Sequence, residues 1–136
     1  MLLPPLHVAT RAATDLVEIT TLVRSALHAS GVESGILVAY VPHTTAGITI
    51  QENADPDVRG DLLLALANAV PARPPAGAYR HAEGNSDAHV KASLVGSAAT
   101  IVVDDGDLVL GTWQGVFLCE FDGPRTRKVL LKLLAG

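Results

Sequence analysis

The sequence contains an uninterrupted apolar run, Gly35-Ile36-Leu37-Val38-Ala39-Tyr40-Val41, which sets a strict limit on the possible folds. The run has the length of a strand and is rich in β-branched residues, a pattern typical of a strand covered on both faces. A second short strand is expected over 47–50. The polar residues between the two strands therefore follow directly on a buried strand.

Two helices are indicated on either side of these strands. Asp15 and Glu18 have the spacing of a capping box, and apolar residues then recur on one helical face until Gly31 stops the helix. Asp55-Pro56 is a second helix start, because Asp caps well and Pro suits the first helical position. The apolar periodicity of that helix continues up to Pro71.

The last part of the chain reads as a third helix followed by strands. Asp87 is expected to cap a helix over 88–95. Alternation, and punctuation by glycines and Asp-Gly pairs, predict the other strands at 6–13, 99–103, 108–110, 116–121 and 128–134. The expected fold class is α+β, with an antiparallel-rich sheet, or two stacked sheets, and helices packed on one side.

Length and charge limit the classes of protein to consider. With 136 residues, 49% of them hydrophobic, residues 1–136 are expected to form a single domain. The net charge of −4 and the scattered Lys and Arg residues argue against nucleic acid as a partner. No apolar run approaches the roughly 20 residues of a membrane span, so a soluble protein without a membrane partner is expected.

A cytoplasmic location is expected on two grounds. The apolar start, residues 1–6, lacks a basic residue and is broken by prolines before a signal core could form. Cys119 is the only cysteine, so no internal disulfide can form, which fits a reducing compartment.

A first polar group of residues flanks the expected strand 47–50. His43-Thr44-Thr45 precede the strand, whereas Glu52, Asn53 and Asp55 follow it and lead into a helix N-terminus. Such a terminus can hold an anion, and these oxygens can ligate a hard cation, so both halves of a metal-phosphate site are available. The alternative is that Asp55 only caps the helix and Asn53 only makes a turn.

A second group lies in residues 81–89. His81, Glu83, Asn85, Asp87 and His89 place two imidazoles and two carboxylates close together around a glycine, Gly84, that frees the backbone. Their spacing matches no standard zinc signature. A solvated turn before a capped helix is therefore an equally good interpretation.

A third group lies near the end of the chain. Trp113-Gln114 stand between glycines, which suggests a bend or bulge that turns both side chains toward something specific. Glu120 interrupts an apolar strand, and alternation favours the solvent face for it. Cys119 is expected to be buried and inert, because no base is tied to it by the sequence.

Three long segments carry a resemblance to a known family: PHTTAGITIQENADPDVRGDL, HAEGNSDAHVKASLVG and DLVLGTWQGVFLCEFDGPRTRKV. In this order and at these separations they closely resemble the YjbQ family, small proteins associated with a secondary thiamine-phosphate synthase activity. The resemblance covers roughly the last hundred residues. It implies a compact α+β fold that assembles as a homotrimer, with the polar segments near subunit boundaries.

The resemblance also implies a site and a reaction. The reaction joins hydroxymethylpyrimidine diphosphate to a thiazole phosphate and releases pyrophosphate. His43, His81 and His89 are implied as metal ligands or catalytic histidines, with the other residues around them: Glu52, Asn53, Asp55, Asn85, Asp87 and Glu120 in catalysis and Thr44, Thr45, Gly84, Trp113 and Gln114 in substrate binding.

Two questions stay open at this point. Three histidines favour zinc, whereas the Glu-Asn-Asp group favours magnesium or calcium, so a divalent metal is expected without a settled identity. The same residue types also suit a metal-dependent hydrolase of a phosphorylated metabolite, or a protein that binds a metal or phosphate ligand without catalysis.

Overall fold

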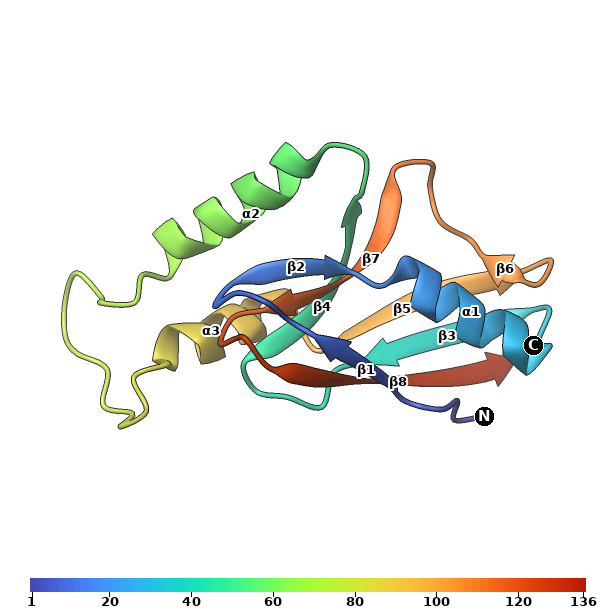
Figure 1. The fold of residues 1–136 in the computed structure, drawn as a ribbon, viewed down its shortest axis with the longest axis horizontal. Helices are drawn as coiled ribbons and strands as arrows, with labels where there is room; N and C mark the ends of the chain where they lie inside the picture. Colours follow the sequence, from blue (N-terminus) through green and yellow to red (C-terminus); the bar gives the residue numbers. More distant parts are fainter.

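Two antiparallel sheets make up most of the molecule, seen in a computed structural model that describes residues 1–136 (Figure 1). The larger sheet has five strands in the order β1 (Leu6–Ala9), β8 (Thr126–Ala135), β3 (Gly35–Tyr40), β5 (Ala98–Asp104) and β6 (Asp107–Leu108). The smaller sheet has three, in the order β2 (Asp15–Glu18), β7 (Gln114–Glu120) and β4 (Ala46–Glu52). The helices are α1 (Thr20–Ser30), α2 (Pro56–Ala69) and α3 (Ser86–Val95).

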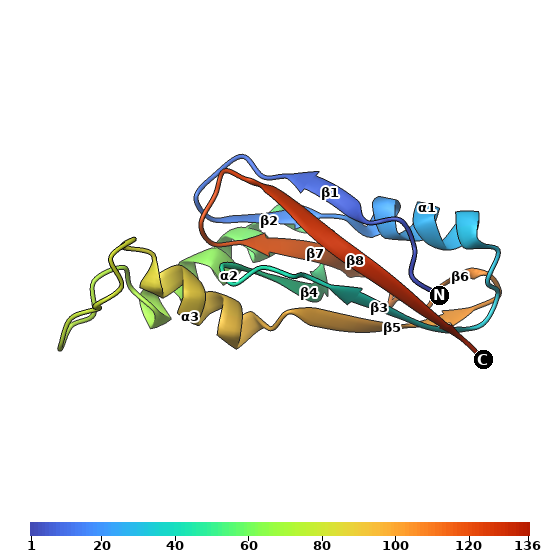
Figure 2. The ribbon, with the colours of Figure 1, turned by 90° about the horizontal axis from the view of Figure 1, so that it is seen from below.

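The two faces of the smaller sheet pack in two different hydrophobic clusters. Strand alternation sends Leu118 of β7 into the main core of 18 buried residues, which also contains Leu37 of β3 and Leu27 of α1. Phe117 and Cys119 point the other way, into a second cluster that α3 covers. Figures 1 and 2 show α1 at one end of the molecule and α2 and α3 at the other. The expected α+β domain with antiparallel sheets is confirmed. The helices do not all pack on one side as predicted, because α1 packs in the main core and α3 packs in the second cluster, on the other face of the smaller sheet.

The outer face of the larger sheet stays open in a single chain. Ile36 of β3 lies opposite Val102 and Leu134 on the neighbouring strands, and these side chains are 41%, 55% and 54% exposed. The position of β3 as a strand is confirmed, but its predicted coverage on both faces is not realised within one chain. Within β3, only the face that carries Leu37 and Ala39 is buried.

The first helix begins later than predicted. Residues Asp15–Glu18 form strand β2, paired with β7, and α1 begins at Thr20 without a side-chain cap. The predicted capping box is therefore wrong. Glu18 instead accepts hydrogen bonds from the Thr20 hydroxyl at 2.9 Å and the Asn53 amide at 3.0 Å, while Gly31 ends the helix in the left-handed conformation as predicted.

The cap of the third helix also differs from the prediction. Asn85 occupies the N-cap position of α3, and Asp87 is already inside the first turn. Its carboxylate accepts a hydrogen bond at 3.2 Å from the buried ammonium group of Lys91, one turn further on. A buried cation needs a charged partner, so pairing takes the place of capping here. The helix ends at Gly96 as predicted.

Other local predictions are confirmed. The Asp55 side chain caps α2 by accepting from the Asp57 amide at 2.9 Å, with Pro56 at the first helical position. Asp105 and Gly106 both have positive φ and turn β5 into β6. None of the helices has the length and apolar character of a membrane span.

Candidate functional site

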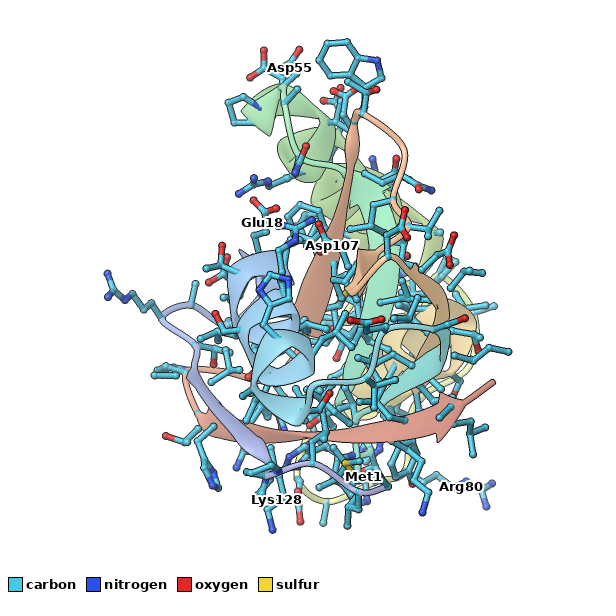
Figure 3. All side chains as sticks on the ribbon, turned by 90° about the vertical axis from the view of Figure 1, so that its right-hand side faces the viewer. Met1, Glu18, Asp55, Arg80, Asp107 and Lys128 are labelled. Atoms are coloured by element: carbon cyan, nitrogen blue, oxygen red, sulfur yellow. The ribbon has the colours of Figure 1, made fainter.

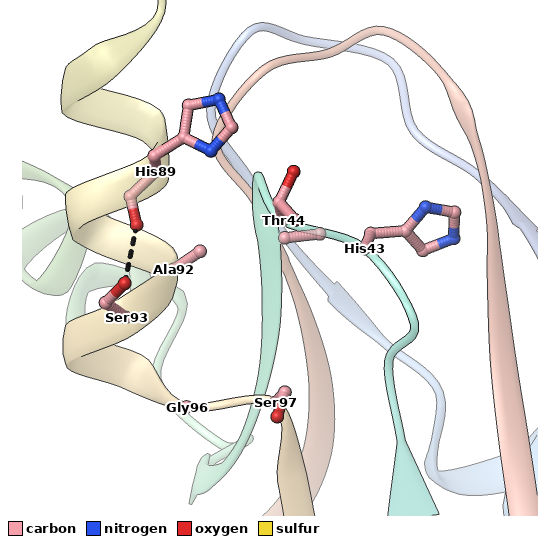
Figure 4. Close-up of a pocket in the computed structure, with 8 residues that line it drawn as sticks. His43, Thr44, His89, Ala92, Ser93, Gly96 and Ser97 are labelled. Carbon is pink, nitrogen blue, oxygen red and sulfur yellow. Dashed lines mark hydrogen bonds between the residues drawn. The ribbon is translucent and has the colours of Figure 1, made fainter.

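Two adjoining hollows open where the segment between β3 and β4 faces α3. They share His43, Thr44 and His89, and we call them together the histidine cleft. The first hollow, of about 370 Å³, is completed by Ala46, Ala92, Ser93, Gly96 and Ser97 (Figure 4). The second, of about 330 Å³, is completed by Pro42, Thr45, Glu83, Asn85, Asp122, Arg125 and Arg127.

A buried ion pair lies behind the second hollow. Glu120 of β7 is fully buried, and Arg127 of β8 is 4% exposed. Arg127 donates from Nε to Glu120 Oε1 at 2.8 Å and from Nη2 to Glu120 Oε2, so the pair is bidentate. Nη2 also donates to the Thr45 hydroxyl at 2.8 Å. The predicted solvent-facing position of Glu120 is therefore wrong, because this charge partner makes burial possible.

The carboxylate of Glu120 has further partners that keep it ionised. The Thr10 hydroxyl donates to Oε1 at 2.7 Å, and the Asp122 amide donates to Oε2 at 3.0 Å. Burial by itself would raise the pKa of Glu120, but the hydrogen bonds from Arg127, Thr10 and Asp122 outweigh it and hold the pKa below its usual value. The guanidinium and the carboxylate thus form a rigid, charged base under the cleft.

His43 is fixed by the backbone of a neighbouring strand. Strand β3 ends at Tyr40, opposite Leu130, so nearer the start of β8 the Lys128 amide has no strand partner on that side. His43 Nε2 accepts from this amide at 2.9 Å. The neutral ring consequently carries its proton on Nδ1, which makes it a hydrogen-bond donor toward its surroundings.

The electrostatic surroundings of His43 favour an anion. Partial burial lowers the pKa of His43 below its usual value, and the positive charges of Arg127, Lys128 and Arg125 lower it further against the opposing effect of Glu120. An imidazole whose protonation is disfavoured by surrounding cations marks a region of positive potential. A ligand with negative charge would find that potential favourable.

His81 and His89 meet without forming a ligand set for a metal. Their rings stand edge to face with centroids 5.4 Å apart, and His81 lies 3.8 Å from Glu83. The lone pair of His43 is occupied by the Lys128 amide. No group of three or more His, Cys, Asp or Glu side chains is arranged so that it could hold a metal ion. The residues of one chain, as arranged, do not fit the expected divalent ion.

The loop after β7 completes the second hollow. The Asp122 carboxylate accepts from the Asn85 amide at 2.8 Å and from Arg125 Nη2 at 3.0 Å. The hydrogen bonds from Asn85 and Arg125, together with the positive charges of Arg125 and Arg127, lower the pKa of Asp122 below its usual value against the opposing effect of partial burial. Asn85 Oδ1 is buried without a partner, so this part of the cleft holds one free acceptor.

The predicted site residues divide into two groups at opposite ends of β4. His43, Thr44 and Thr45 lie at the start of the strand, in the histidine cleft. A second set lies at the other end of the strand: Glu52, Asn53, Asp55, Trp113 and Gln114. Asn53 N–H donates to the Trp113 carbonyl at 2.9 Å, and Glu52 pairs with Gln114. Figure 3 shows Asp55 at the top of the view and Lys128 at the bottom. Lys128 marks the cleft, because its backbone amide donates to His43.

Two other predicted site residues, Asp87 and Gly84, have local roles. Asp87 pairs with Lys91 and lines neither hollow. Gly84 adopts a left-handed turn beside Tyr79 and His81, in a separate surface hollow. Cys119 is buried as expected, and burial raises the pKa of its thiol to about 12.

Several residues of the cleft were not foreseen from the sequence. Arg127 could have been found, because β8 alternates and Arg127 shares the buried parity of Val129, Leu131 and Leu133. An arginine at a core-facing position requires a buried acceptor, and Glu120 supplies it. Thr10, Asp122 and Arg125 carry no such signal, since loop geometry alone brings them to the site.

Comparison with known proteins gives consistent results. A model of the family described as "UPF0047 protein YjbQ-like" matches residues 5–136. UPF0047 protein MJ1081 of Methanocaldococcus jannaschii is 50% identical over 94% of this chain and 91% of its own. UPF0047 protein YugU of Bacillus subtilis is 45% identical over 98% and 99%.

Solved structures agree with this fold over almost the whole chain. A conserved protein of the YjbQ/UPF0047 family from Clostridium acetobutylicum superimposes with a TM-score of 0.91 at 50% identity, covering 96% of this chain and 99% of that one. Hypothetical protein APE1520 from Aeropyrum pernix superimposes with a TM-score of 0.92 at 33% identity, and each chain is covered completely.

Proposed function

The chain belongs to the YjbQ-like UPF0047 family, and on that premise we propose that it is a small-molecule transferase of the thiamine-phosphate synthase type. Its phosphorylated substrate binds in the histidine cleft. The reaction is one that the enzyme can carry out as a secondary activity. The family membership supports the reaction class, and the cleft supports the kind of substrate.

The observation that carries the proposal is the fixed guanidinium of Arg127. Glu120 and Thr45 engage Nε and Nη2, whereas Nη1 makes no hydrogen bond within the chain. Arg127 lines the second hollow, so Nη1 is a preorganised donor for a phosphoryl oxygen. Arg125, which lines the same hollow, adds a second guanidinium nearby.

The transfer step requires stabilisation of the negative charge on the leaving group, which these residues can supply. The bond between the pyrimidine methylene carbon and the diphosphate oxygen breaks, and the thiazole nitrogen forms a bond to that carbon. Inorganic pyrophosphate leaves with the bonding electron pair. The negative charge that develops on the leaving oxygen is stabilised by Arg127, by Arg125 and by the Nδ1–H group of His43. His89, on the opposite wall, can donate a proton to the departing group.

The steps above are assigned to side chains of the chain alone. The expected zinc or magnesium ion would neutralise diphosphate charge if bound, but no step here is assigned to it, because the side chains of one chain do not fit it as arranged. Metal analysis of the purified protein, with and without chelator, tests that expectation directly.

The proposal is tested by supplying purified protein with hydroxymethylpyrimidine diphosphate and thiazole phosphate. We expect thiamine phosphate and pyrophosphate in equal amounts, and loss of product in His89→Ala. Phosphate release from a panel of phosphate esters without coupling would instead identify a hydrolase. Thermal stabilisation by these ligands without any turnover would identify a binding protein.

We further propose that the protein assembles as a homotrimer and works in the cytoplasm. The open apolar face around Ile36, Val102 and Leu134 supports assembly, because a second copy could cover it. The buried, unpaired Cys119 is compatible with a reducing compartment. Light scattering at micromolar concentration is expected to give the mass of three chains. A monomeric mass would contradict the assembly.

A further inference from the structure

The two halves of the histidine cleft differ in chemistry. The second hollow, which we call the charged hollow, contains Arg125 and Arg127 together with two carboxylates. The first, which we call the neutral hollow, contains no charged side chain apart from the shared histidines. One wall of the cleft therefore suits a phosphoryl group, and the other suits an uncharged part of a ligand.

The neutral hollow has a rigid frame. The end of α3 is tied to β4 by a hydrogen bond from the Ile48 amide to the Gly96 carbonyl at 3.0 Å. A Cβ atom at Gly47 would lie 2.7 Å from that carbonyl, so strand and helix approach as closely as their backbones allow. The small side chains of Ala46 and Ala92 leave the space open above this contact.

Two hydroxyl groups line the opening of the neutral hollow. Ser93 Oγ donates to the His89 carbonyl at 2.9 Å, which leaves its lone pairs free to accept (Figure 4). The Ser97 hydroxyl makes no hydrogen bond within the chain, so it can donate or accept. Close packing of α3 on β4 explains Ala46 and Ala92, but it does not require hydroxyls at Ser93 and Ser97.

We propose that the neutral hollow is a separate subsite for an uncharged heteroaromatic ring. The phosphoryl group of the same ligand occupies the charged hollow, and His43, Thr44 and His89 flank the bond between the two parts. The assignment of the phosphoryl group rests on the proposed function. The volume of about 370 Å³ is at the small end of ligand pockets and suits a single ring. Serine hydroxyls at its rim suit ring nitrogen atoms or an amine.

The subsite can be tested by binding alone, with inorganic phosphate and phenyl phosphate as probes in calorimetry. In the native protein, phenyl phosphate should bind at least about tenfold more tightly, since burial of a ring favours binding. Ser93→Phe should fill the neutral hollow and remove this advantage while leaving the affinity for inorganic phosphate unchanged. Arg125→Ala should weaken both probes by the same factor. Ser25→Phe, the same change on the exposed surface of α1, is the matched control.

The outcomes separate this inference from the proposed reaction. Equal affinities of the two probes in the native protein, or a Ser93→Phe variant that keeps the tenfold advantage, would overturn the subsite. A Ser93→Phe variant that loses both probes would also overturn it, because the two hollows would then be one. The expected binding pattern in a protein that makes no thiamine phosphate would retain the subsite and reject the reaction.

Discussion

The two ends of strand β4 carry polar residues of similar types but in very different states. At its start, Thr45 bonds the buried guanidinium of Arg127, and the neighbouring His43 is held by a backbone amide. At its far end, Asp55 caps a helix, and Trp113 is 63% exposed. Polar residues become a site where their partners are already fixed. A polar composition alone does not achieve this.

Loss of the buried ion pair at the start of β4 should lower the stability of the protein far more than a substitution at the other end. Arg127→Met leaves the buried carboxylate of Glu120 without its charge partner and should cost about 3–5 kcal/mol in urea unfolding. Trp113→Ala, at the open end, should cost about 0.5 kcal/mol or less. Adding Glu120→Leu to Arg127→Met should recover part of the loss, because it removes the uncompensated charge. A cost below about 1 kcal/mol for Arg127→Met would remove the distinction between the ends.

Glycine-to-alanine substitutions near the two ends should change the free energy of unfolding in opposite directions. A Cβ atom at Gly123, beside the cleft, would lie 2.3 Å from the Ala12 carbonyl oxygen and 2.8 Å from Glu120 Cγ. Gly123→Ala should therefore destabilise the protein by about 1–3 kcal/mol. Gly60 lies in α2 with open space around it, so Gly60→Ala should stabilise by roughly 0.5–1 kcal/mol. Thermal melts of both variants check the prediction, and a neutral Gly123→Ala would contradict the close packing.

Removal of the α2 cap should affect stability and leave the cleft unchanged. Asp55→Ala should cost about 1 kcal/mol, whereas Asp55→Ser, which keeps a capping oxygen, should cost much less. Neither variant should alter the affinity for inorganic phosphate, since the cap lies at the other end of β4. A loss of phosphate affinity in Asp55→Ser would assign Asp55 to the ligand site after all.

The smallest expected effect is a pH dependence from His43. Burial and neighbouring cations lower the pKa of His43 in the folded state, so the unfolded chain binds the proton more readily. The stability linked to this group is fully present above the unfolded pKa of about 6.5 and is lost as pH falls through the folded pKa. Gln cannot take up a proton but can accept from the Lys128 amide. The Tm of His43→Gln should therefore fall less between pH 7.5 and 5 than that of the native protein, and superimposable profiles would contradict the shift.

Much of the fold could be predicted from local patterns. The run from Gly35 to Val41, the Asp55-Pro56 start and the Asp105-Gly106 turn act over a few residues, and each is present as expected. Residues 15–18 misled the prediction, because Asp-x-x-Glu spacing serves a capping box and a paired strand equally well. Pairing with β7, which is distant in sequence, decides in favour of the strand.

The site was predictable only in part, for a geometric reason. Residues His43 to Thr45 and Glu52 to Asp55 are close in sequence, but the strand between them separates them by about 3.3 Å per residue. Conversely, Glu120 and Arg127 are buried together across a turn between two different sheets. Their partnership depends on how the sheets stack, which no local pattern encodes.

The hydrogen bond from the Lys128 amide to His43 also provides a built-in reporter of the cleft. The imidazole occupies a place that a strand carbonyl would fill, so a rotation of the ring would release a backbone proton to solvent. Hydrogen exchange at this single amide would then follow ring motion, and its nuclear magnetic resonance frequency would change when a ligand contacts Nδ1. Occupancy of the cleft could thus be monitored at the main chain, without a label on the ligand.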